Sequence, residues 1–474
     1  MRGLFGRDSL YVLIWGLQVG VAALSIPVTT RLLGRNFGVV TTAFAVMQIL
    51  VPLCSFSLST SVQRAYRADG GARDARRTIT LMFVTAGITL AIATATRPYW
   101  IGLLRLDRNA RIAVEYAIVW AALSALTNAG LAFIRSANKL LAFVVVSLIQ
   151  SVIAVIASVA LIVLVRRTPA EFVLGQLLSQ APAAALALAV ARPLPIRVRD
   201  LPLMRRALGY SAGLVPASLA TFLMSSSDRI VIRHDLPIIQ ASRYGAVYNL
   251  AAIPILLLGS LDSIWLPRFF AMAESSTLST LVASSRDALY QLLIPVILGL
   301  SFGLPLVLAV WVPRSYDPAG LYLVVATISV SGFAVVGWSA ANRVLLLAGN
   351  TRPVGLCMVI AAIFNVAANV VLDPVIGLEG AALSTLLAYV LLHALTLRFA
   401  HRARPLRRPP LRLALYCAAT VISAAACSAM PASGAFVIVR SATTLVCLAG
   451  FAATLRAVVG SGRRRVVSGA TSAS

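Results

Sequence analysis

Long apolar runs separated by short polar loops repeat along the whole chain. We count fourteen runs of roughly 20 residues, the length that a helix needs to cross a bilayer. Their hydrophobicity is continuous instead of alternating, which predicts helices and excludes a membrane β-barrel. We therefore predict an all-α integral membrane protein. The runs cover residues 10–30, 38–62, 78–96, 112–134, 143–165, 172–191, 207–227, 245–266, 289–312, 320–341, 354–372, 378–399, 413–430 and 435–455.

The composition supports the same class. Hydrophobic residues make up 59% of the 474 residues and charged residues 12%, whereas soluble domains average about 45–50% and about 25%. With so much of the chain in apolar runs, no sizeable soluble domain fits. The five cysteines all lie inside apolar runs and show neither a disulfide framework nor zinc spacing. The first run lacks a cleavage site of small residues, so we expect it to stay as a helix.

The chain is strongly basic, and most of its basic residues lie in the loops between the apolar runs. The formal net charge is +26, from 41 basic and 15 acidic residues. Such a charge suggests nucleic acid in a soluble protein, but here the arginines sit in short loops between membrane runs. With the N-terminus in the cytoplasm, the inside segments hold 28 of the basic residues and the outside segments 13. The positive-inside rule then predicts cytoplasmic N- and C-termini in the inner (cytoplasmic) membrane, and no nucleic-acid partner.

An internal repeat is visible at two places. Residues 35–40 (RNFGVV) match residues 242–247 (SRYGAV) at an offset of 207, and a weaker match joins residues 136–139 to 348–351. The two copies are six helices apart, and an even number of crossings returns the chain to the same side of the membrane. The repeat therefore predicts two six-helix lobes with the same orientation in the membrane. The predicted domains are an N-terminal lobe at 1–206, a C-terminal lobe at 207–411, and two additional helices with a basic cytoplasmic tail at 412–474.

Polar residues recur at helical spacing within several runs. The second run carries Thr41, Gln48, Ser55 and Ser59, and the seventh carries Ser211, Ser218 and Ser225. Such stripes are typical of residues that line a shared cavity or that hydrogen-bond between packed helices. The sequence leaves both interpretations open.

Charged residues inside the runs are candidates for function, because ionisable groups in a membrane are costly. Asp262 lies well inside the eighth run, and Glu115 lies near the start of the fourth; both are candidates for coupling an ion to transport. Arg31 and Arg64 lie at run ends, where either snorkelling to lipid headgroups or substrate binding would explain them.

The eleventh run carries Asn365, Asn369 and Asp373 at intervals of four residues, on one face of a helix. We interpret this stripe as an interhelical contact. No Walker A loop, no histidine spacing for a metal and no nucleophile–base pair is present in the sequence. We therefore predict no catalytic site and no metal, and the chain is not expected to be an enzyme.

Several motifs resemble a known family. Residues 27–34 (PVTTRLLG) with Phe37-Gly38 resemble the first helix of polysaccharide flippases. Residues 228–232 with Tyr244-Gly245 are similar to the end of that family's seventh helix. Asn365 and Asn369, followed by the turn at 377–382 (GLEGAA), resemble the family's most recognisable signature. The family is the polysaccharide biosynthesis branch of the multidrug/oligosaccharidyl-lipid/polysaccharide exporter superfamily.

The resemblance implies two bundles around a cationic cavity that flip a polyprenyl-diphosphate-linked oligosaccharide by alternating access. It implies a lipid-linked glycan as substrate, membrane lipid as surroundings, and a polysaccharide polymerase and glycosyltransferases as partners. No cofactor is expected beyond a coupling ion, H⁺ or Na⁺. Arginine binds diphosphate well, so Arg31, Arg64, Arg229 and Arg343, near the predicted cavity ends, are our candidates for phosphate contact. Gln48, from the polar stripe of the second run, is a further substrate-binding candidate in the cavity.

Two alternatives stay open. A multidrug cation antiporter of the same superfamily would need acidic residues in its cavity, and Asp262 and Glu115 would serve. A membrane-embedded glycan polymerase or ligase would need a cluster at the outer face, where Asp228, Asp235 and Arg243 are the obvious group.

Overall fold

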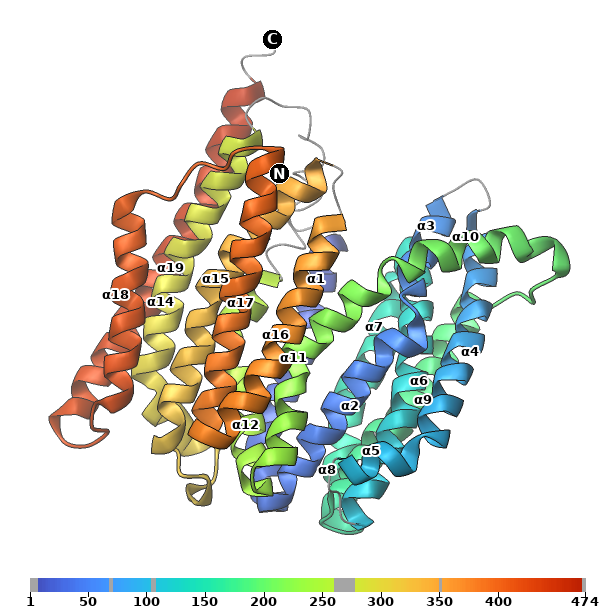
Figure 1. Cartoon of the computed structure of the whole chain (residues 1–474), viewed down its shortest axis with the longest axis horizontal. Helices are drawn as coiled ribbons and strands as arrows, with labels where there is room; N and C mark the ends of the chain where they lie inside the picture. The colour runs from blue at the N-terminus through green and yellow to red at the C-terminus, as the bar shows by residue number, and fades with distance from the viewer. Residues whose placement is uncertain (1–6, 68–70, 104–107, 260–277, 349–351, 471–474) are drawn as a thin grey trace. The chain divides into compact units, whose positions relative to one another are not determined.

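The computed structural model describes residues 7–67, 71–103, 108–259, 278–348 and 352–470. Every regular element in these ranges is a helix (Figure 1). Eleven of the helices are long and apolar enough to cross a membrane, and two bent helix pairs raise the number to thirteen when each pair is one span. The chain is therefore an all-helical, multi-pass membrane protein, and this predicted fold class is confirmed.

The first helical stretch contains two of the predicted spans. It runs over Gly16–Ser55, which is 40 residues, and would be about 60 Å long if straight. That is twice the roughly 30 Å of a bilayer's hydrocarbon core. A 3₁₀ turn, η1 (Gly34–Asn36), divides it into α1 (Arg7–Leu33) and α2 (Phe37–Ser55), and Gly34 has a left-handed φ of 52°. The stretch therefore accommodates two crossings, and the count of fourteen stays a prediction.

The predicted seventh span contains a break. Helix α10 (Leu201–Ala212) and helix α11 (Val215–Asp235) are bent by 40° at residues 213–214. Pro216 sits in the first turn of α11, where its missing N–H costs no intrahelical hydrogen bond. At 21 residues, α11 alone is about 31 Å long, enough to cross. The predicted span at 207–227 is thus shifted, because its first third belongs to α10.

Packing divides the chain into two compact units. Unit 1 comprises Met1–Ala246 and Val366–Gly377, and unit 2 comprises Val247–Asn365 and Leu378–Ser474. Packing groups α10 and α11 with unit 1, so the division into lobes at residues 206 and 411 stays a prediction. The remaining helices of unit 1 are α3 (Leu58–Arg67), α4 (Gly71–Ala95), α5 (Arg97–Leu103), α6 (Arg108–Ser136), α7 (Leu140–Leu148), the π-helical η2 (Ile149–Ile153), α8 (Ala154–Leu164), α9 (Pro169–Ala191) and η3 (Val198–Asp200). Those of unit 2 are α14 (Leu278–Trp311), η4 (Arg314–Tyr316), η5 (Ala319–Leu321), α15 (Tyr322–Leu347), α17 (Leu378–Ala403), α18 (Leu411–Ala429) and α19 (Ala435–Ala470), while α12 (Ile238–Ala251) and α16 (Arg352–Ile376) have residues in both.

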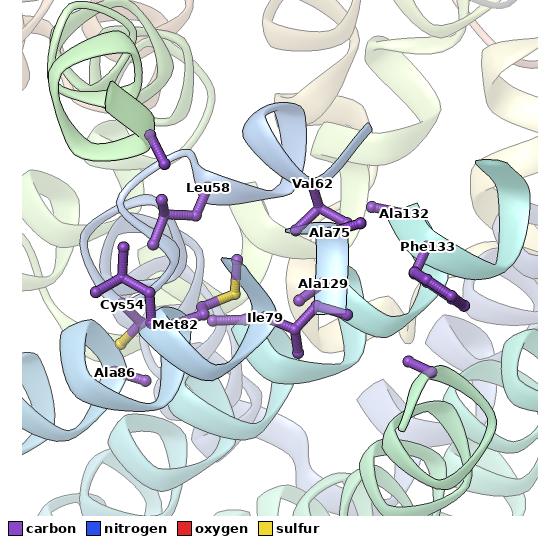
Figure 2. Packing of buried hydrophobic residues seen from close by; sticks show 14 of the residues in the cluster. Cys54, Leu58, Val62, Ala75, Ile79, Met82, Ala86, Ala129, Ala132 and Phe133 are labelled. Carbon is purple, nitrogen blue, oxygen red and sulfur yellow. The ribbon is translucent and has the colours of Figure 1, made fainter. Parts of the chain in front are cut away.

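Small residues allow the helices of unit 1 to pack closely. On α9, Gly175 lies so near α8 that an added Cβ would be 2.4 Å from the Cα of Ser158. On α6, Gly130 is equally tight against Ala187. Small residues at such crossings let backbones approach where the surrounding lipid offers no hydrophobic driving force. The core of the unit joins α2, α3, α4 and α6; Figure 2 shows part of it, with Cys54, Leu58, Val62, Ala75, Ile79, Met82, Ala86, Ala129, Ala132 and Phe133 labelled.

The last two helices are packed on unit 2. Helix α19 lies along α14, where an added Cβ on Gly299 or Gly303 would be 3.1 Å from Cys447 or 3.2 Å from Thr444. Arg440, buried on α19, donates to the carbonyl oxygens of Cys427 at 2.7 Å and Met430 at 2.6 Å. These carbonyls belong to the end of α18, where intrahelical partners run out. Arg440 therefore joins α18 to α19.

Candidate functional site

The two copies of the repeated motif contact each other within unit 1. The Gly38 backbone N–H, at the start of α2, donates to Ser242 Oγ on α12 at 2.6 Å. Ser242 Oγ in turn donates to the Arg35 carbonyl oxygen at 2.7 Å. An added Cβ on Gly38 would be 2.7 Å from the Ile238 carbonyl oxygen. Helices α2 and α12 can therefore come close enough for these hydrogen bonds only because residue 38 is a glycine, which has no Cβ.

The equivalent glycine of the second copy makes the matching contact. Gly245 lies 207 residues after Gly38, and a Cβ there would be 2.3 Å from Thr41 Cγ2. Thr41 also donates to the Ala241 carbonyl oxygen at 3.4 Å. Each copy thus presents its glycine to the other, which explains why the aromatic–glycine step occurs at both positions.

Further polar contacts within unit 1 join α2, α3 and the turn between them to α10 and α11. Ser226 on α11 donates to Gln48 Oε1 on α2. Ser57 donates to Ser218 at 3.1 Å. Beyond it, Ser61 on α3 and Ser211 on α10 share a hydrogen bond of 2.8 Å. We call this set, Gln48, Ser57, Ser61, Ser211, Ser218 and Ser226, the serine seam. Gln48, Ser211 and Ser218 came from the predicted stripes, and the seam gives them an interhelical packing role.

The seam also shows where the predicted stripe fails. A continuous helix would place Ser59 on the same face as Ser55, four residues earlier. The helix instead breaks after Ser55, because Phe56 and Ser57 have left-handed φ values of 45° and 53°. The break rotates the following helix, and Ser57 and Ser61 contact the neighbouring helices in place of Ser59. Positive φ at a non-glycine residue has no strong sequence signal, so periodicity alone could not find it.

Two candidate arginines of unit 1 are exposed at helix ends. Arg31, in the last turn of α1, donates to the Pro27 carbonyl oxygen at 2.8 Å. Arg64, near the end of α3, lies over the ring of Tyr210 on α10, with 4.6 Å between its guanidinium carbon and the ring centroid. A cation over an aromatic face is a stabilising arrangement. Their roles in substrate binding stay predictions.

The other two candidate arginines are buried, and they lie in different units. Arg229 on α11 belongs to unit 1, and Arg343 on α15 belongs to unit 2, where it donates to Ser285 Oγ at 3.1 Å. Buried guanidinium groups are rare unless hydrogen-bonded or paired. Arg343 therefore has a polar partner inside the helix packing, and Arg229 interacts electrostatically with the buried Asp228.

Unit 1 contains two buried carboxyl groups, those of Asp228 and Asp373, which we call the acidic site. The Tyr244 hydroxyl donates to Asp228 Oδ2 at 2.5 Å, and the Arg229 backbone N–H donates to Oδ1 at 2.8 Å. Asp373, at the end of α16, is fully buried, and neither carboxyl oxygen has a hydrogen-bond partner among the described residues. The charges of Asp228 and Asp235 act on it electrostatically. The sequence shows Asp373 only as the last member of the polar stripe. Its burial and its interaction with other carboxyl groups depend on tertiary structure, so the sequence alone does not mark it as a functional residue.

The two predicted coupling carboxyl groups have different outcomes. Glu115 on α6 forms an ion pair with Arg97 at 2.9 Å, and their side chains are 38% and 48% exposed. Such exposed pairs contribute little stability, and the pair gives Glu115 a partner at the end of its helix. Asp262 lies outside the described residues. The coupling role of both stays a prediction.

The asparagines of α16 are buried, and the interhelical contact expected of their stripe stays a prediction. Asn365 and Asn369 are both inaccessible, whereas Ile363, Val371 and Val375 on the same helix are more than 60% exposed. The helix thus has a polar buried side and an apolar exposed side, the expected arrangement for a helix in lipid. Throughout the part of the chain that the structure describes, no three His, Cys, Asp or Glu residues lie close enough to hold a metal ion.

Known proteins share this fold. The lipid II flippase MurJ in an inward-closed conformation is 11% identical, with a TM-score of 0.69 over 95% of this chain and 99% of MurJ. An inward-facing multidrug resistance MATE family transporter of the MOP superfamily is 13% identical, with a TM-score of 0.62 over 84% of this chain and 98% of that one. An outward-facing MATE transporter is also 13% identical, with a TM-score of 0.56 over 86% and 96%. These likenesses show a common fold.

The sequence itself matches a family over more than half its length. A comparison with curated protein sequences finds no match. Residues 6–273, however, match the family described as polysaccharide biosynthesis protein. The predicted family is thus confirmed: the chain belongs to the polysaccharide biosynthesis protein family and has the fold of MOP superfamily transporters.

Proposed function

We propose that this protein is a flippase that moves a polyprenyl-diphosphate-linked oligosaccharide across the cytoplasmic membrane for surface polysaccharide export. The observation that carries the proposal is the family match over residues 6–273 in a chain whose fold resembles a lipid II flippase along 95% of its length. The two findings support one substrate class. The family match supports a glycan as the cargo, and the likeness to a lipid II flippase supports a glycan that is attached to a lipid carrier.

The charge of the chain supports an anionic head group. Forty of the 41 basic residues are arginines, and the planar guanidinium binds phosphate oxygens in pairs. Arg31, Arg64, Arg229 and Arg343 remain the candidates for the diphosphate, and Gln48 remains a substrate-binding candidate in the cavity. Neutralising all four arginines should abolish transport at normal protein levels, and unchanged transport would remove them from the site.

The acidic site of unit 1 supports ion coupling. Asp228 and Asp373 are both buried and interact electrostatically, and ionised carboxyl groups in a membrane are costly unless a cation balances them. Asp373 has no hydrogen-bond partner among the described residues, so a proton or Na⁺ is the fitting companion. We assign the coupling ion to this site alongside the sequence-based candidates Glu115 and Asp262.

The alternatives make different predictions. The likeness to MATE transporters supports a drug antiporter. If the protein were one, a strain lacking it would keep every glycan unchanged. A polymerase or ligase would use Asp228, Asp235 and Arg243, but Asp228 is fully buried and bonded to Tyr244. That geometry does not favour a reacting group at an outer surface.

The test is the pool of lipid-linked glycan in a strain lacking the protein, with the plasmid-borne gene as control. A flippase predicts complete lipid-linked units on the cytoplasmic face together with loss of surface polymer. Units that reach the outer face but stay unpolymerised would instead indicate an enzyme. No change in any glycan would indicate the antiporter.

A further inference from the structure

The segment between α9 and α11 is fixed to unit 1 on one side. Thr80 of α4 donates to the Leu194 carbonyl oxygen at 2.6 Å. Arg77 pairs with Asp200 at 3.0 Å, and the Arg197 backbone N–H donates to the same carboxylate at 2.9 Å. Helix α10 then buries Met204, Ala207 and Ser211, one face at helical spacing, against the unit. The connection between the sixth and seventh spans is therefore an ordered part of unit 1.

The opposite side of the segment is basic and apolar. Val198 is 87% exposed and Leu201 65% exposed. The exposed arginines of the segment are Arg192, Arg197, Arg205 and Arg206. We call these six residues the interface face. Large exposed aliphatic residues beside arginines are unusual on a surface that meets only water.

Within the part of the chain that the structure describes, no ion pair neutralises these arginines. Asp200 is the only acidic residue between positions 192 and 213, and its carboxylate is taken by Arg77 and the Arg197 backbone. Asp74 of α4, the acidic residue of the adjoining helix, also lies beside Arg77, at 3.6 Å. The charge of the interface face is thus available to a partner outside the chain.

The orientation of α10 matches a membrane surface. Figure 1 shows α10 running across the ends of α3 and α4, which it contacts, instead of along them. A helix that lies across the ends of membrane spans lies near the plane of the bilayer surface. Exposed aliphatic side chains would enter the acyl boundary there, and arginines would meet headgroups.

We propose that the interface face binds anionic phospholipids of the cytoplasmic leaflet. Basic residues beside a membrane-surface helix attract anionic headgroups, and buried apolar area adds to the binding. This would fix the end of unit 1 that carries the connection to α11 at the bilayer surface. The inference does not rest on the proposed transport substrate.

The test is the binding of phosphatidylglycerol to the purified full chain in detergent, titrated by native mass spectrometry. The double variant Arg205→Gln/Arg206→Gln should bind about 10- to 30-fold more weakly. The matched control is Arg166→Gln/Arg167→Gln, an exposed pair in the loop between α8 and α9, which should bind as wild type does. Added salt should weaken wild-type binding more than it weakens that of the double variant.

Three outcomes would overturn the proposal. The first is equal loss in the double variant and its control. The second is equal binding of phosphatidylcholine, which carries no net charge, by the wild type. The third is displacement of phosphatidylglycerol by undecaprenyl diphosphate at lower concentration, which would make the face a site for the carrier lipid. Thermal denaturation of both variants in the same detergent verifies that each is folded.

Discussion

At the residue scale, the carboxyl groups of Asp228 and Asp373 stand out because both are buried within a membrane protein. The spacing of four predicts an interhelical contact for Asn365, Asn369 and Asp373; all three are buried, and the contact itself stays a prediction. The missing partner of Asp373 was not visible, because a hydrogen bond depends on residues distant in sequence. Asp228, which the polymerase or ligase alternative would use at the outer face, has a buried carboxylate that accepts a hydrogen bond from Tyr244.

The coupling site leads to a prediction for Asp373. Asp373→Asn should abolish the dependence of transport on pH or Na⁺, because asparagine cannot take up a proton or balance a cation. At high pH and without Na⁺ the variant should be more stable than wild type by about 1–3 kcal/mol, because an ionised Asp373 would then have neither a cation nor a hydrogen-bond partner among the described residues. Transport in vesicles at varied pH and Na⁺, with thermal denaturation in detergent, measures both.

Glu379→Gln is the matched control, because Glu379 is an exposed carboxylate six residues further along the chain. It should keep the ion dependence of the wild type. Retained ion dependence in Asp373→Asn would remove Asp373 from the coupling site. Loss in both variants would indicate a general effect of charge instead.

The contact between the repeated motifs predicts a steric effect at Gly245. Gly245→Ala would place a Cβ 2.3 Å from Thr41 Cγ2, and such overpacking costs about 1–3 kcal/mol. Melting temperature in detergent should fall, and Thr41→Ala in the same chain should recover part of the loss. Gly87→Ala is the control, since nothing lies within 4 Å of its added Cβ; equal melting temperatures for the two alanine variants would contradict the tight contact.

At the element scale, the apolar runs predicted the helices because a membrane helix must bury a continuous stretch of about 20 residues. The sequence does not predict where a helix breaks inside an apolar run. The breaks at Phe56-Ser57 and at residues 213–214 fall inside apolar or mixed sequence. The predicted seventh span includes residues 207–212 of helix α10, because the run at 207–227 continues across the break without a change in its pattern.

The junction of α18 and α19 gives a prediction at this scale. Arg440→Gln should lower the free energy of unfolding by about 1.5–3 kcal/mol, because the charge-assisted hydrogen bonds to the end of α18 are lost. The loss should appear in thermal denaturation and in faster proteolysis of the loop at residues 430–434. Arg412→Gln serves as control because Arg412 is exposed, and equal stability of the two variants would show that Arg440 does not hold the junction.

At the scale of the whole molecule, composition and length were enough to predict a multi-pass helical protein, and the family motifs predicted its family. The offset of 207 residues anticipated that the two glycine motifs are equivalent. It did not anticipate that they contact each other, because a repeat defines equivalence and not proximity. The arrangement of the candidate arginines depends on tertiary packing that no local pattern encodes.

The orientation in the membrane is a prediction of the same scale. With 28 of the 41 basic residues on one side, both termini should lie in the cytoplasm. A fluorescent protein fused after Ser474 should therefore be fluorescent, and alkaline phosphatase at the same position should be inactive. Active phosphatase at the C-terminus would reverse the assignment of every loop, including the interface face.

The central claim is that this chain moves a lipid-linked glycan across a bilayer, and purified protein in vesicles tests it most directly. Lipid-linked glycan extracted from the strain lacking the protein would be placed in one leaflet, and its accessibility to an impermeant lectin or oxidant followed over time. We predict that vesicles with the wild-type protein equilibrate the glycan between leaflets far faster than protein-free vesicles. Equal rates in the two, with folded protein present, would contradict the account.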